Sequence, residues 1–165
     1  MFNKIFSWFE NRLNPYPEGN PTTPKKGLLS FIWSSIEGMK GWILLLTVLT
    51  VGTGVMEAVL FQFMGTLVDW LGTFTPETLW QEKGHLLIGI AALLLVSIVW
   101  GFLASTVRLQ TLQGVFPMRL RWNFHRLMLG QSLSFYQDEF AGRVSAKVMQ
   151  TALAVRDTVL TLADM

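Results

Sequence analysis

The feature that most constrains this chain is an uncharged apolar run from Leu86 to Val107. As an α-helix its 22 residues would measure about 33 Å, enough to cross the roughly 30 Å hydrocarbon core of a bilayer. The run has no polar face, and a helix that is apolar on all sides lies in lipid or in a large protein core. A chain of 165 residues has no large soluble core, so the run predicts a transmembrane helix over 86–107.

A second, less uniform apolar segment predicts another transmembrane helix over about 42–71. Glu57 interrupts it near the middle, where a charged side chain costs on the order of 3 kcal/mol to insert. Two interpretations are open: Glu57 belongs to a substrate or proton path, or it is a protonated carboxyl that bonds a neighbouring helix or faces a water-filled cavity. Both keep Glu57 away from lipid. Gly54 and Ala58 form a small-xxx-small spacing that would let another helix approach beside it.

The basic residues predict how these helices cross the membrane. Of the 13 Lys and Arg, five precede the first segment, Lys83 alone lies between the two, and seven follow the second. Because cytoplasmic flanks carry the excess of basic residues, we expect the N-terminus and residues 108–165 in the cytoplasm of a bacterial-type inner (plasma) membrane, and 72–85 as an outer loop. The scattered basic residues do not favour a nucleic-acid partner, which requires a basic face.

The sequence of residues 1–41 predicts two helices joined by a linker. Residues 1–13 have the spacing of an amphipathic helix that lies on a membrane surface, and residues 14–26 form a Pro-rich linker. Residues 27–41 predict an interfacial helix that turns into the first span. Trp42 would mark the inner interface, and Trp100, inside the second span, would pack against another helix.

After the second span, helical spacing continues into the cytoplasm, with a kink expected at Pro117. The spacing stops near Gly130, and a short helix is expected over 134–142. Ser134 is its expected N-cap, with Gln137 three residues on, and Gly142 suits the position just after its end.

A third long helix is expected over 144–165 because a heptad-like apolar stripe begins there and predicts contact with a partner helix. The stripe consists of Val144, Val148, Val155, Val159 and Leu162. The pattern is still running at Met165 without a stop signal, so we expect the sequence to be a piece of a longer protein.

The short helix presents aromatic and acidic side chains between two long helices that leave the membrane. It could dock on a soluble partner through its aromatic groups, or it could be an ordinary helix-turn-helix tip in water. Its residues are Phe135, Tyr136, Gln137, Asp138, Glu139, Phe140, Ala141 and Gly142.

Residues 119–159 resemble the first intracellular loop of ABC exporters of the multidrug and lipid-flippase type. The resemblance follows a fixed order along the chain: a Leu- and Arg-containing helix, the aromatic pair Phe135 and Tyr136, then Gly142, Ser145 and Lys147. Lys147 stands where the family usually has Arg, and Gln150 and Thr151 replace a common Asn-Asp pair.

The resemblance implies an all-α membrane protein whose two transmembrane helices, with long cytoplasmic extensions, are part of a six-helix exporter domain. Residues 134–142 would be the first coupling helix, which docks on a nucleotide-binding domain of the same or a partner chain. The expected partners are therefore membrane lipid, that domain, and a second half-transporter in a dimer.

Catalytic chemistry is not expected on this chain. It has no G-x-x-x-x-G-K-[ST] loop, so the ATP and Mg that the resemblance implies for a full-length transporter would bind outside it. It has no Cys, and His85 and His125 lie far apart, so no metal site is expected. Charged residues make up 15%, below the roughly 25% of soluble domains. The alternative function is a self-standing two-span anchor or adaptor for a soluble partner.

Overall fold

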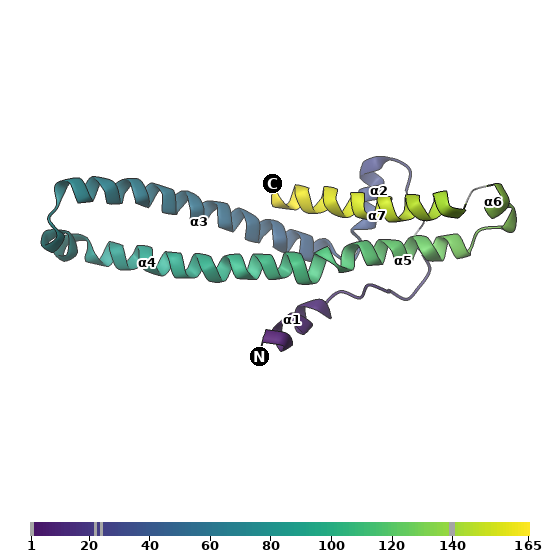
Figure 1. Cartoon of the computed structure of the whole chain (residues 1–165), viewed down its shortest axis with the longest axis horizontal. Helices are drawn as coiled ribbons and strands as arrows, with labels where there is room; N and C mark the ends of the chain where they lie inside the picture. The colour runs from purple at the N-terminus through teal and green to yellow at the C-terminus, as the bar shows by residue number, and fades with distance from the viewer. Residues whose placement is uncertain (1, 22, 24, 139–140) are drawn as a thin grey trace. The chain divides into compact units, whose positions relative to one another are not determined.

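The computed structural model describes residues 2–21, 23, 25–138 and 141–165, and every regular element within these ranges is a helix (Figure 1). The expected all-α fold is thus confirmed for the described residues. In chain order the helices are α1 (Phe2–Glu10), α2 (Leu28–Ser35), α3 (Lys40–Thr73), α4 (Pro76–Thr106), the π-helix η1 (Val107–Gln113), α5 (Val115–Leu129), α6 (Leu133–Asp138) and α7 (Ala141–Asp164).

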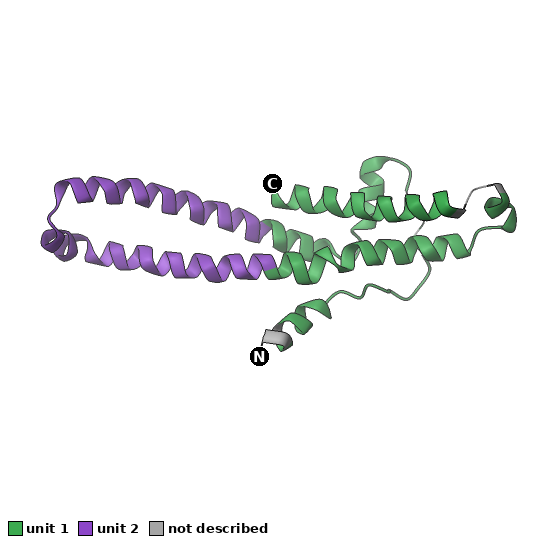
Figure 2. Ribbon diagram, in the orientation of Figure 1, with its two compact units in different colours: residues 1–47, 106–165 green, residues 48–105 purple. Residues whose placement is uncertain are grey.

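The chain divides into two compact units (Figure 2). Unit 2 comprises residues 48–105, which are most of α3 and nearly all of α4. Unit 1 comprises residues 1–47 and 106–165, which hold the other helices and the start of α3.

Helices α3 and α4 contain the two predicted spans. Among the described residues, they are long and apolar enough to cross a membrane, by length and composition. Helix α3 has 34 residues and α4 has 31, so each exceeds the roughly 20 residues that a bilayer requires.

The connection predicted over 72–85 is mostly helical, which corrects the expected loop, while its placement outside the membrane stays a prediction. Only Phe74 and Thr75 separate α3 from α4. Pro76 opens α4 at a position where its fixed φ and missing N–H are tolerated, and the Thr75 N–H donates to Thr78 Oγ1 at 3.1 Å. Hydropathy reports how long the apolar part of a helix is and not where the helix begins, so the polar first turns of α4 read as loop.

Trp100 joins the two helices of unit 2. Its Nε1 donates to the carbonyl oxygen of Leu49 at 2.9 Å, and its ring lies over Gly52. The prediction that Trp100 packs against a helix is confirmed. A Cβ on Gly52 would come within 2.6 Å of Trp100 Cζ2, whereas one on Gly54 would have nothing within 4 Å. The close approach within this chain therefore falls on Gly52, two residues before the predicted position.

The core of unit 1 forms where α7 returns beside α5 (Figure 1). On the stripe predicted to meet a partner helix, Val155 and Val159 are buried, but Leu162 is 65% exposed. Leu160 and Ala163 are buried instead, and the step of four residues from Val159 to Ala163 follows the α-helical period. The partner of the stripe is α5 of the same chain. The buried apolar residues contributed by these two helices are Phe116, Leu120, Ala152, Val155, Val159, Leu160 and Ala163.

The helix that leaves unit 2 changes geometry before Pro117 rather than at it. Residues 107–113 form η1, a π-helix. Val107 and Leu112 are both fully buried although they are five positions apart, because the wider π turn brings residues at that spacing onto one face. Pro117 has no N–H to bond to the carbonyl of Gln113, so the regular α-helical ladder cannot run through this point.

The N-terminal segment packs on the same region. Helix α1 lies against η1, and Thr111 Oγ1 donates to the carbonyl oxygen of Phe9 at 3.4 Å. The ring of Phe9 also meets that of Trp42, with centroids 6.4 Å apart. The expected interfacial helix over 27–41 is shorter: α2 ends at Ser35, and a turn follows in which Gly38 has φ +80°, a conformation that favours glycine.

Candidate functional site

The tip between α5 and α7 is capped differently from the prediction. Helix α6 begins at Leu133, so Ser134 lies inside it and is not its N-cap. Ser132 takes that role, because its Oγ accepts from the Phe135 N–H at 3.4 Å. Both positions hold serine, and cap propensity alone does not distinguish them.

The end of the predicted short helix also differs. Helix α6 ends at Asp138, and α7 begins at Ala141, so Gly142 lies in the first turn of α7 and does not follow the end of α6. Glu139 and Phe140 lie outside the described residues. Gln137 is exposed, as expected for a tip residue.

The aromatic pair of the tip partly faces its own scaffold. The rings of Phe135 and Tyr136 meet edge to face with centroids 5.3 Å apart. The Tyr136 hydroxyl donates to the carbonyl oxygen of Met128 at 2.6 Å, close to the end of α5. Tyr136 therefore fixes α6 to α5, and only part of its surface is available for a partner.

Two leucines that the sequence pattern did not single out dominate the exposed apolar surface of the tip. Leu129, the last residue of α5, is 72% exposed, and Leu133, the first residue of α6, is 75% exposed. They flank the three-residue turn at Gly130. Apolar residues on both sides of a short turn are the signal that could have identified them.

Glu57, the candidate path residue, lies in unit 2 on an exposed face of α3. Within the described residues it has no hydrogen-bond or ion-pair partner. A carboxyl group in the middle of an apolar helix needs cover by protein or water, and the residues that the structure describes supply none. The structure does not bring Glu57 together with other acidic or basic groups of unit 2.

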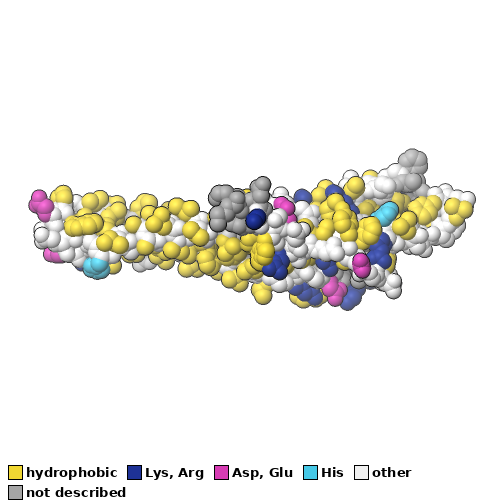
Figure 3. Space-filling model, turned by 90° about the horizontal axis from the view of Figure 1, so that it is seen from below, with side chains coloured by type: hydrophobic (Ala, Val, Ile, Leu, Met, Phe, Trp, Pro, Cys, Tyr) yellow, Lys and Arg dark blue, Asp and Glu magenta, His cyan; other side chains and the backbone are white. Residues whose placement is uncertain are grey.

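Unit 2 presents an apolar surface to its surroundings. On the side shown in Figure 3, most Lys and Arg lie over unit 1, whereas the stretch of unit 2 is mainly hydrophobic. Its exposed side chains include Val51, Val55, Phe61, Met64, Leu95 and Val99. Monomeric proteins in water rarely expose contiguous apolar surface of this kind, which marks contact with lipid or other protein.

Phosphate-binding loops and clusters of metal ligands are the side-chain patterns by which nucleotide and metal sites are recognised. The sequence has no phosphate-binding loop, and no group of three or more His, Asp or Glu comes together in the described residues as a metal site. Serine and threonine hydroxyls in the helices mostly bond carbonyls of their own helix, as Thr53 does to Leu49. The tip and the apolar spans are therefore the features from which function can be argued.

Comparison with known proteins relates the chain to ABC transporters. It is 92% identical over all 165 residues to a protein of Haemophilus influenzae with the name "Uncharacterized ABC transporter ATP-binding protein". The chain covers 27% of that relative, about a quarter of its length. No protein-family model matches the chain, and no solved structure matches it.

Proposed function

We propose that this chain is part of the transmembrane domain of an ABC exporter, to which it contributes two membrane helices, α3 and α4, and the first coupling helix, α6. The observation that carries the proposal is its 92% identity with the Haemophilus influenzae relative. The two long apolar helices and the exposed tip of unit 1 support the same assignment. The chain resides in the inner (plasma) membrane, with its N-terminus and α6 in the cytoplasm.

In this proposal α6 transmits movement by resting on a nucleotide-binding domain. Leu129 and Leu133 provide the contact, since both are largely exposed and lie on either side of the turn that begins the tip. Tyr136 ties α6 to the end of α5, and α5 packs on α7, so a push on the tip moves both long helices together. Rigid apolar anchors of this kind dominate the energetics of protein contacts.

In this proposal the nucleotide-binding domain and the other membrane helices of the transporter belong to a longer protein. ATP and Mg bind to the nucleotide-binding domain of the same or a partner chain, and two half-transporters form the dimer. The name of the Haemophilus influenzae relative, which includes ATP binding, and the 27% of its length that the chain covers support this division.

The decisive experiment compares the tip in the short chain and in the full-length protein. Leu133→Cys introduces a thiol into a sequence that has no Cys. Its labelling rate with a soluble maleimide, mapped by mass spectrometry, is expected to fall at least about tenfold in the full-length protein, because a docked interface excludes water. Lys25→Cys, on the exposed linker, is the control and is expected to label equally in both.

Equal labelling of Leu133→Cys in both proteins would refute α6 as a docking element. An immunoblot of native membranes with an antibody against residues 14–26 tests the size of the product. A stable band near 18.7 kDa, in place of one several times larger, would favour the self-standing adaptor over the exporter.

A further inference from the structure

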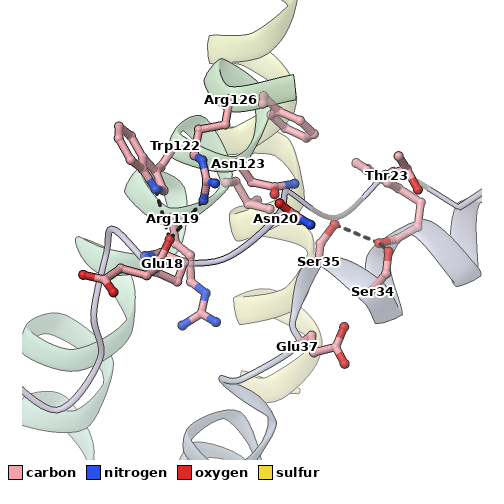
Figure 4. A pocket seen from close by; sticks show the side chains of 14 residues that line it. Glu18, Asn20, Thr23, Ser34, Ser35, Glu37, Arg119, Trp122, Asn123 and Arg126 are labelled. Atoms are coloured by element: carbon pink, nitrogen blue, oxygen red, sulfur yellow. Dashed lines mark hydrogen bonds between the residues drawn. The ribbon is translucent and has the colours of Figure 1, made fainter. Parts of the chain in front are cut away.

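A cavity of about 200 Å³ lies within unit 1, between the linker that follows α1, helix α2 and helix α5 (Figure 4). Four charged residues line it: Glu18 from the linker, Glu37 from the turn after α2, and Arg119 and Arg126 from α5. None of the functions discussed above uses it.

The linker is held across this cavity by its backbone. The carbonyl oxygen of Pro17 accepts from Trp122 Nε1 and from Arg126 Nη1, both at 3.3 Å (Figure 4). Tyr16 adds an edge-to-face contact with the Trp122 ring, with centroids 5.4 Å apart. The wall of the cavity is thus built by contacts between residues more than 100 positions apart in the chain.

Three of the four charges are uncompensated. Arg126 is bonded to the linker, but Arg119 is half-buried and has neither a hydrogen bond nor an ion pair within the described residues. The carboxyl groups of Glu18 and Glu37 are exposed and likewise form no ion pair with any described residue. A half-buried guanidinium with five unused donors is an obvious position for an oxyanion.

The size and charge of the cavity restrict the ligand. Its volume is below the roughly 300–1,000 Å³ of pockets that hold drug-sized molecules, so a small headgroup fits better. Two acids and two bases give no net charge, which suits a zwitterion. Arg119 would bind phosphate oxygens through its planar fork, and the carboxylate of Glu37 would accept hydrogen bonds from a primary ammonium.

Helix α2 offers a route for such a ligand from the membrane. Its cavity side carries Ser34 and Ser35, while Leu29 and Trp33 are exposed on a different face of the helix. A helix of this pattern lies in the membrane surface with its apolar side in the acyl chains, and its polar side then lies at the level of the headgroups.

We propose that this cavity binds the phosphoethanolamine headgroup of a membrane phospholipid, with the phosphate at Arg119 and the ammonium at Glu37. The proposal rests on the membrane placement given under the proposed function. It adds a lipid site within unit 1, with the linker after α1 as one wall.

Native mass spectrometry of the detergent-purified chain tests it with three phospholipids of identical acyl chains. Phosphatidylethanolamine is expected to bind about tenfold more tightly than phosphatidylcholine, which lacks ammonium N–H donors, and than phosphatidylglycerol, which lacks the ammonium. Arg119→Gln is expected to weaken phosphatidylethanolamine binding by a similar factor. Glu37→Gln is expected to reduce the preference over phosphatidylcholine, and Arg143→Gln, at an exposed position of α7, to change nothing.

Equal binding of the three lipids, or full binding by Arg119→Gln, would overturn the proposal. Displacement of the lipid by millimolar inorganic phosphate would also overturn it, because the site would then take a free anion. Membrane fractionation of the same variants separates this failure from that of the proposed function. A chain that stays in the membrane without lipid preference refutes the lipid site alone, and a chain absent from the membrane refutes the placement.

Discussion

Unit 1 buries apolar side chains in a core of its own, whereas unit 2 leaves most of its apolar side chains exposed. Unit 2 is the more apolar, yet among the described residues its buried apolar side chains are Leu49 and Leu79. Unit 1 carries most of the charge and contains the rest of the buried core, from Leu13 to Ala163. Hydrophobic composition alone therefore does not indicate where a chain has its own core. In unit 2 it indicates surface that lipid or further protein must cover.

Substitutions should therefore destabilise the two units in different ways. Unit 1 is stabilised by a core of many side chains, so removing a large one leaves a cavity. The helices of unit 2 meet at Trp100 and Gly52, so a single change there can separate them.

The largest effect is expected from Phe116→Ala in unit 1. Phe116 is fully buried in α5, and truncating a buried Phe costs about 3–5 kcal/mol. The detergent-purified chain should lose its cooperative thermal transition or unfold at a much lower temperature. Met118→Ala, two residues away and 40% exposed, is the control with a small shift. Equal shifts for both variants would mean that unit 1 has no core of its own.

The next largest effect is expected from Gly52→Leu in unit 2. The new Cβ would lie 2.6 Å from Trp100 Cζ2, so the ring must move and its bond to the Leu49 carbonyl is lost. Overpacking costs about 1–3 kcal/mol. Cysteine cross-linking between α3 and α4 should fall in this variant. Gly54→Leu, with open space around it, should leave cross-linking intact, and a fall in both would place the contact elsewhere.

The same contrast explains which elements the sequence could predict. Long-range apolar periodicity predicts α3, α4 and α7 because it reports burial or lipid exposure over many turns. The contact of Trp100 follows from a large ring with one polar N–H inside an apolar helix. The sequence predicted that the apolar stripe of α7 contacts another helix. Only the structure identifies that helix as α5 of the same chain.

What could not be predicted depends on local backbone geometry. The residue types of η1 do not distinguish a π-helix from an α-helix. Its geometry is seen only in the structure, where Val107 and Leu112, five positions apart, are both buried. Ser132 and Ser134 are equal candidates for the cap of α6 until the hydrogen bond to Phe135 is known. The linker is held through the carbonyl of Pro17, a group that every residue type has, so no side-chain pattern marks it. The coupling role of the tip stays a prediction.

A smaller effect is expected from Tyr136→Phe at the tip of unit 1. The variant removes the hydroxyl that donates to the Met128 carbonyl, a loss of about 1 kcal/mol. Amide hydrogen exchange in α6 should accelerate several-fold, while α5 and α7 keep their protection. Tyr16→Phe is the matched control, since the sequence has two tyrosines. Unchanged exchange in α6 would show that this bond does not hold the tip.

The smallest effect is expected at the ion pair between Arg108 and Asp164, whose Nη2 and Oδ2 atoms are 2.9 Å apart. The pair joins the start of η1 to the end of α7, but both side chains contact solvent, so it contributes less than about 1 kcal/mol.

Asp164 is also the last residue of α7, where a carboxylate opposes the helix dipole by about 0.3–1 kcal/mol. The two effects nearly cancel in Asp164→Asn, whereas Arg108→Gln loses the pair without that compensation. Thermal unfolding at low salt should therefore show a larger loss for Arg108→Gln, and the difference should shrink in 1 M salt because screening weakens the pair. Equal, salt-independent losses would mean that Arg108 stabilises unit 1 through packing of its aliphatic stem.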